Sequence, residues 1–84
     1  MTNQQLYLEI VTPEKMIFSK SVTSVNFPGE IGSFSILKLH APLIAALKEG
    51  EIKVMDQFSE EFTFNCKSGV VECLDNKITV LIEC

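Results

Sequence analysis

Apolar and polar residues alternate along most of this chain. Leu6, Leu8 and Ile10 alternate with Tyr7 and Glu9, a period of two that places successive side chains on opposite faces of a β-strand. The same kind of pattern, bounded by turn residues, returns in segments 16–18, 21–27, 34–36, 52–54, 58–66, 70–74 and 78–82. Many short strands at close spacing are typical of a β-sandwich or barrel. No window has the apolar spacing and caps of a long helix, so we expect an all-β domain.

The turns between these segments contain residues that bend the backbone. Pro28-Gly29 combines a fixed φ with a residue that accepts positive φ. We expect Lys48–Glu51 to form a hairpin loop that contains a glycine. Asp75-Asn76 suits a two-residue hairpin turn, because both residues tolerate a left-handed φ.

The run His40–Leu47 is more apolar than a half-exposed strand needs. Six of its eight residues are apolar, yet it is too short to span a membrane. In a strand, Leu43 and Ala45 would lie on one face and Ile44 and Ala46 on the other. We expect both faces to be covered by protein, and in so short a chain we expect one cover to be a partner.

The composition indicates a small domain with an interface. The chain has 84 residues, of which 46% are hydrophobic, with a mean hydropathy of +0.25 and a net charge of −4. A single domain of residues 1–84 buries only about 60 to 65% of the surface that the unfolded chain exposes, so the apolar excess indicates an interface. Seven basic against 11 acidic residues give no positive field for phosphates, and we expect no nucleic-acid binding.

The sequence has no segment that approaches the roughly 20 consecutive apolar residues of a transmembrane helix. The start Met1–Gln5 lacks the parts of a secretory signal, so we expect a soluble, cytoplasmic chain. The three cysteines lack Cys-x-x-Cys spacing, which fits reduced thiols. We expect Cys66 and Cys73 to be buried as small hydrophobic residues, and Cys84 to be exposed and inert.

Residues that would support catalysis are sparse. The sequence has no Gly-x-x-x-x-Gly-Lys loop, no paired histidines and no convincing Ser/His/Asp grouping. His40 is the only histidine, and we expect a loop residue with satisfied hydrogen bonds, or a contact or pH-sensitive group at an interface. Glu49 with Glu51, and Glu60 with Glu61, are expected to be solvated charges. We therefore expect no active site, no metal and no cofactor.

An ordered set of short motifs runs through nearly the whole chain. It comprises Leu8–Lys15, Phe18-Ser19, Val22, Pro28-Gly29, Gly32, Ile36-Leu37, His40-Ala41-Pro42-Leu43, Ala46-Leu47-Lys48, Gly50, Ser68-Gly69 and Val80-Leu81. This set, with His-Ala-Pro-Leu at its centre, resembles the epsilon subunit of F-type ATP synthases. The resemblance implies a ten-strand β-sandwich, the amino-terminal domain of that family.

The resemblance also implies a role. Family members are non-catalytic parts of the central stalk, or rotor, that bind the gamma subunit and rest on the c ring, where they help couple proton or sodium transport to ATP synthesis. For this chain it implies a peripheral location at the cytoplasmic face of the bacterial inner membrane. An unoccupied apolar face would let the isolated chain self-associate.

The family's interface positions can be carried over to this sequence. The gamma-subunit interface then includes Thr12, Leu43 and Ala45. For Leu43, a simple core position is an equal alternative. The c-ring interface then includes Glu30, Ser33 and His40.

The chain departs from the family pattern in three places. Leu37-Lys38-Leu39 precedes His40 where similar chains have Leu-Pro-Gly, so we expect a different loop shape. Ser33 stands where the family often has an acidic residue, so a charge-assisted contact is missing or moves to Glu30. The sequence stops at Glu83-Cys84, where typical members continue into two helices, so we expect neither helix-driven inhibition nor an ATP site.

Two other classes of small β protein also have about this size. A biotinyl or lipoyl carrier needs a lysine at the tip of a tight hairpin, and Lys77 after Asp75-Asn76 is the only candidate. A carbohydrate-binding sandwich needs exposed aromatic platforms, and this chain has no Trp and one Tyr. Both fit the sequence less well than a rotor subunit.

Overall fold

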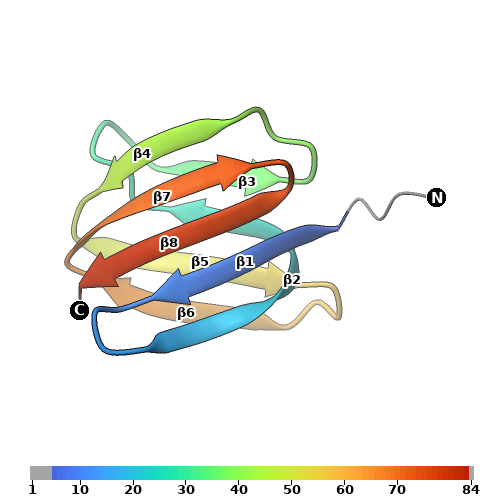
Figure 1. Ribbon diagram of the computed structural model, residues 1–84, viewed down its shortest axis with the longest axis horizontal. Helices are drawn as coiled ribbons and strands as arrows, with labels where there is room; N and C mark the ends of the chain where they lie inside the picture. The colour runs from blue at the N-terminus through green and yellow to red at the C-terminus, as the bar shows by residue number, and fades with distance from the viewer. Residues whose placement is uncertain (1–4, 84) are drawn as a thin grey trace.

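Eight strands make up the fold in the computed structural model, which describes residues 5–83 (Figure 1). They are β1 (Leu6–Val11), β2 (Met16–Phe27), β3 (Phe34–Leu37), β4 (Leu43–Leu47), β5 (Gly50–Asp56), β6 (Glu61–Cys66), β7 (Ser68–Leu74) and β8 (Lys77–Glu83). The predicted all-β class is confirmed. The strand count is eight where the resemblance implied ten. β2 is a single strand whose two halves lie in different layers. Within residues 5–83 no helix is long and apolar enough to cross a bilayer.

The strands form two layers that share β2. The pairing order is β4-β7-β8-β1-β2-β5-β6, with β3 paired to β2. Figure 1 shows β4, β7, β8 and β1 as the front layer and β3, β5 and β6 behind it. The first half of β2 pairs with β1, and its second half lies between β3 and β5. The register shifts between Val22 and Ser24, where β2 passes from the front to the rear layer.

The first and last strands, β1 and β8, are neighbours in the front layer. β1 pairs antiparallel with β2 on one side and parallel with β8 on the other. Tyr7 is opposite Lys77, and Ile10 is opposite Val80. The sandwich is therefore completed only when the last strand is in place.

The core lies between the layers and contains the residues that the period-two pattern assigns to one face. In β1, Leu6, Leu8 and Ile10 are buried, and Tyr7 and Glu9 are only partly covered. The other fully buried large side chains are Val25, Phe27, Ile36, Leu47, Ile52, Val54, Val71, Ile78 and Ile82. Each strand has a hydrophobic inner face, so burial of apolar surface favours this register over one shifted by a residue.

Aromatic rings and two thiols complete the core. The Phe18 ring meets the rings of Phe62 and Phe64 edge-on, at centroid distances of 5.3 and 5.4 Å. Cys66 and Cys73 are buried, as predicted. The prediction for Cys84 falls outside the described residues.

The turn between β7 and β8 is the hairpin turn that the sequence predicted. Asp75 and Asn76 have φ values of 52° and 62°, the left-handed conformation of a tight hairpin turn. The hairpin predicted at Lys48–Glu51 is wrong, because β4 pairs with β7, and β5 pairs with β2 and β6. Leu39 has a φ of 66° in the loop between β3 and β4. For a leucine this conformation is strained, because its Cβ crowds the following carbonyl oxygen.

A candidate interaction surface at the β3–β4 edge

The front and rear layers are open toward each other at the edge where β3 and β4 lie. We call this region the β3–β4 edge, and it consists of loop 28–33, β3, loop 38–42 and β4 (upper part of Figure 1). A cavity of about 370 Å³ opens there. Its lining residues are Gly29, Glu30, Ile31, Gly32, Phe34, Leu43, Ile44, Ala45 and Ala46.

Large apolar side chains are exposed along this edge. Ile31 is fully exposed, Ile44 is 73% exposed, and Leu37 and Leu39 are also exposed. They account for four of the nine exposed large hydrophobic residues in the described chain. Each of the four segments of this edge thus exposes one large apolar side chain, which favours an interaction site here.

β4 presents different residues to its two faces. Leu43 and Ala45 are partly buried and pack against the core, whereas Ile44 and Ala46 are exposed. The expectation that protein covers both faces therefore holds within this chain only for the inner face. The outer face of the predicted apolar run is open.

Loop 28–33 is tied to one end of β4. The Glu30 amide donates to the Ala46 carbonyl at 3.0 Å, and the Lys48 amide donates to the Pro28 carbonyl at 2.9 Å. The Gly32 amide closes the loop by donating to the Gly29 carbonyl at 3.2 Å. The side chains of Glu30 and Ser33, both predicted to face the c ring, are exposed on this loop.

Loop 38–42 lies at the other end of β3. The Leu39 amide donates to Oδ1 of Asn76 at 2.7 Å, which fixes the loop to the β7–β8 turn. His40 is half-buried, and its Nδ1 lies 2.7 Å from the carbonyl oxygen of Ala41. His40 is thus a loop residue with a local hydrogen bond, as one of the two interpretations predicted. β3, which is about 13 Å long, lies between this loop and the loop that contains Glu30 and Ser33.

Thr12 lies apart from this edge. It is in the turn between β1 and β2, and β7 and β8 lie between β1 and β4 in the front layer. Its Oγ1 donates to the carbonyl oxygen of Lys15 at 3.1 Å and accepts from the Lys15 amide at 3.2 Å. The structure therefore brings Leu43 and Ala45 together but not Thr12, whose hydroxyl already stabilises its own turn.

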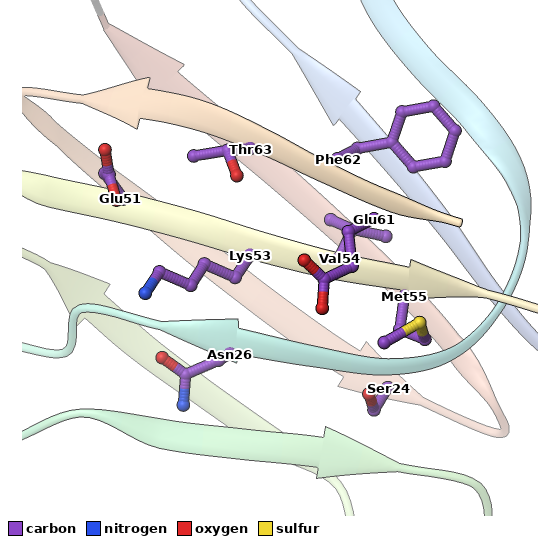
Figure 2. A pocket seen from close by; sticks show the side chains of 9 residues that line it. All are labelled: Ser24, Asn26, Glu51, Lys53, Val54, Met55, Glu61, Phe62 and Thr63. Carbon is purple, nitrogen blue, oxygen red and sulfur yellow. The ribbon is translucent and has the colours of Figure 1, made fainter. Parts of the chain in front are cut away.

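A second, larger hollow lies on the outer face of the rear layer (Figure 2). Polar and charged side chains cross its floor, with Asn26, Lys53 and Thr63 opposite one another on adjacent strands. Glu51 and Glu61 flank Lys53 in Figure 2. This polar face is typical of a solvated sheet surface, and the apolar β3–β4 edge is the better candidate for a protein interface.

The described residues offer little support for a metal site or for a carrier lysine. Residues 5–83 contain no group of three or more His, Cys, Asp or Glu side chains placed to hold a metal. Lys77 lies at the start of β8 rather than at the turn tip, and its Nζ is 3.6 Å from Oε1 of Glu9. A lysine in an ion pair on a sheet face does not match the isolated hairpin lysine of a carrier domain.

Fold and surface together define a class: a small β-sandwich domain with an apolar edge suited to protein contacts. Comparison with known families identifies the particular one. The family described as "ATP synthase, Delta/Epsilon chain, beta-sandwich domain" matches residues 5–84, and the chain belongs to this family. The predicted resemblance is confirmed, and the carrier and carbohydrate-binding alternatives are wrong.

Relatives and solved structures agree with this assignment. The ATP synthase epsilon chain of Chlorobium limicola is 46% identical over 76 residues, which are 90% of this chain and 86% of the relative. That of Nitratiruptor sp. is 46% identical over 80 residues, 93% of this chain but 60% of the relative. A chain of the Euglena gracilis mitochondrial ATP synthase has the same fold, with a TM-score of 0.89 at 14% identity, over 98% of this chain and 52% of the other.

Proposed function

We propose that this chain is a non-catalytic subunit of the central stalk of an F-type ATP synthase, which binds the gamma subunit and rests on the c ring. In this role it helps couple proton or sodium transport to ATP synthesis, at the cytoplasmic face of the bacterial inner membrane. The family assignment supports membership in the complex. The open apolar β3–β4 edge is the observation that supports a role through contacts with other subunits.

The gamma subunit is proposed to bind at β4. Leu43 and Ala45 line the cavity from the inner side, and Ile44 stands outward beside them. A partner that covers these residues would remove exposed apolar surface from water, which favours binding by roughly 25 cal/mol per Å² before the costs of association. Thr12 remains a predicted gamma contact, on a separate part of the surface.

The c ring is proposed to contact the two loops that flank β3. Glu30 and Ser33 offer an acidic and a hydroxyl side chain at one end, and His40 lies at the other. Because the two loops lie at opposite ends of β3, they would contact different parts of the ring. The exposed carboxylate of Glu30 can make the charge-assisted contact that Ser33 cannot.

A rotor part must deform little under load, and the packing of this domain meets that need. The two layers enclose one continuous hydrophobic core, and β2 belongs to both. Interiors packed at protein density have low compressibility. Force applied at the β3–β4 edge therefore reaches both layers in two ways: through the backbone of β2 and through side-chain contacts in the core.

A capture experiment from native membranes tests the proposed function. The full chain serves as bait, beside Ile44→Asp and Phe58→Asp, and bound proteins are identified by mass. Ile44 and Phe58 are 73% and 76% exposed, but Phe58 lies in the β5–β6 turn, away from the edge. We expect ATP synthase subunits with the wild-type chain and Phe58→Asp, and their loss with Ile44→Asp.

Two outcomes would contradict the proposal in different ways. If a folded wild-type bait captures no synthase subunits, the function is wrong. If Ile44→Asp captures them as well as Phe58→Asp does, the β3–β4 edge is not the binding surface. Circular dichroism of each bait confirms that it is folded.

A further inference from the structure

β4 has backbone groups on its outer edge that no other strand uses. It pairs with β7 on one side, and on the other side only its end is covered, by residues 28–30. The two bonds there use the Ala46 carbonyl and the Lys48 amide. Alternate residues of a strand point their backbone groups to the same side, so the amide and carbonyl of Ile44 and the amide of Ala46 face this edge. No partner for them exists within residues 5–83.

This edge is not protected in the ways that most edge strands are. Natural sheets protect exposed edges with charged residues, proline or bulges. Pro42 directly precedes β4 and Lys48 directly follows it, but the strand itself, Leu-Ile-Ala-Ala-Leu, contains none of these. By contrast, β6 at the opposite end of the strand order begins with Glu61, directly after Glu60. An apolar, unprotected edge strand is suited to pairing with another chain.

The cavity of the β3–β4 edge lies beside these free groups. Four of its nine lining residues belong to β4 and only Phe34 to β3. A strand added to β4 would continue the front layer, and every second side chain would point toward the rear layer. Those side chains would enter the cavity between Phe34, Leu43 and Ala45.

We propose that an extended strand of a partner subunit adds to β4, pairing with the amide and carbonyl of Ile44 and the amide of Ala46, and inserting an apolar side chain into this cavity. Strand addition takes affinity from main-chain hydrogen bonds and specificity from pockets for alternate side chains. A helix would not serve, because its own backbone groups are already paired. The identity of the donor as the gamma subunit rests on the proposed function.

Charge further specifies the donor strand. Residues 28–30 already act as a short partner of β4, with Gly29 opposite Leu47, so the added strand would continue from the point where Glu30 leaves. The Glu30 side chain is exposed at the cavity and has no ion-pair partner in the described part of the chain. The donor strand is therefore apolar in its middle, with a Lys or Arg at the end beside Glu30.

A proline substitution tests the backbone pairing directly. Ile44→Pro removes the outward amide and leaves the bonds to β7 intact, because residues such as Ala45 make those. Ile44→Val is the matched control, since it keeps the amide and nearly the same side chain. Both variants and the wild-type chain are titrated onto a gamma-containing F1 complex depleted of this subunit. We expect Ile44→Pro to bind roughly tenfold more weakly, and Ile44→Val within about threefold of wild type.

Hydrogen exchange supplies a measurement that needs no variant. In the isolated chain the Ile44 and Ala46 amides should exchange quickly, and in the complex at least roughly tenfold more slowly. The Ala45 amide, which faces β7, should be protected in both. Equal binding by Ile44→Pro and Ile44→Val, or unchanged exchange at Ile44 and Ala46 in a formed complex, would overturn strand addition alone. Failure of the wild-type chain to bind the complex would overturn the proposed function instead.

Discussion

The ammonium group of Lys20 lies 3.2 Å from Oδ2 of Asp56, a carboxylate whose side chain is fully buried. Oδ1 of the same carboxylate accepts hydrogen bonds from the amides of Phe58 at 2.8 Å and Glu60 at 2.9 Å. Lys20 is in β2, and Asp56 ends β5. One side chain thus holds the β5–β6 turn in shape and links it to the strand that both layers share.

Replacing this carboxylate is expected to destabilise the domain. Asp56→Asn keeps the size but removes the charge that Lys20 faces and weakens the acceptor for two backbone amides. We expect the melting temperature to fall by several degrees. Glu61→Gln, a change of an exposed acid at the start of β6, is the control and should leave the melting temperature unchanged. Thermal unfolding followed by circular dichroism makes the comparison.

The same site predicts how stability depends on pH. Hydrogen bonds from the Glu60 and Phe58 amides, together with Lys20, hold the pKa of Asp56 below its ordinary value of 3.8, although burial acts in the other direction. The folded-state pKa is lower than the unfolded one, so the stabilisation is complete above about pH 4 and is lost as pH falls through the folded-state pKa. The gap in melting temperature between wild type and Asp56→Asn should therefore shrink from pH 6 to pH 3. A constant gap would contradict this account.

Two glycines in loop 28–33 should respond differently to alanine. A Cβ on Gly29 would lie 2.5 Å from the Gly32 carbonyl oxygen and 2.8 Å from Cε1 of Phe34, whereas one on Gly32 would meet nothing within 4 Å. Gly29→Ala must displace the loop, and we expect a loss of about 1 to 3 kcal/mol in the free energy of unfolding. Gly32→Ala should be close to neutral. Chemical denaturation of both proteins provides the test, and equal stabilities would refute the crowding argument.

Leu39 offers a stabilising substitution. Its φ of 66° costs a residue with a Cβ about 1 to 2 kcal/mol, and glycine adopts it freely. Glycine also loses more entropy on folding, by about 0.5 to 1 kcal/mol. Leu39→Gly should therefore raise the free energy of unfolding by about 0.5 to 1 kcal/mol, whereas Leu39→Ala, which keeps the Cβ, should not. Urea denaturation that ranks alanine at or above glycine would show that the strain is absent.

The buried thiols should be chemically silent in the folded protein. Burial raises the pKa of the Cys73 thiol. Cys66 is 2% exposed and Cys73 is 1% exposed. The reactive thiolate of Cys73 is therefore scarce, and both sulfur atoms are shielded from reagents. In a Cys84→Ser background at pH 8, we expect Ellman's reagent to modify both thiols roughly a hundredfold more slowly than in guanidinium, because modification requires opening. Rapid modification of the folded chain would contradict their burial.

Period-two alternation was enough to predict most of the fold. In β1 and β8 every second residue is apolar, and each of these, from Leu6 to Ile82, is buried where the pattern placed it. The Asp75-Asn76 turn followed from the tolerance of those two residues for positive φ. Such features depend on neighbours in sequence, which is why a single sequence reveals them. The left-handed φ of Leu39 had no such signal, because the loop that joins β3 and β4, two strands in different layers, imposes it.

The candidate site was predictable in its residues but not in its arrangement. The apolar run indicated an interface, and Leu43 and Ala45 do lie at the β3–β4 edge. Thr12 does not, because strand order in the front layer, which local patterns do not encode, places β7 and β8 between it and β4. The free amide of Ile44 could not be predicted from the sequence either, because it depends on where residues 28–30 stop pairing with β4.

The parallel pairing of β1 with β8 affects how this protein is made. Because Tyr7 is opposite Lys77 and Ile10 is opposite Val80, almost the whole chain must be synthesised before β1 can acquire its second neighbour. Contacts this distant in sequence require the entropy of closing a long loop before they contribute any stability. On the ribosome, the nascent chain therefore carries the apolar face of β1 incompletely covered until β8 has emerged. The sandwich can therefore close only after β8 has left the ribosome.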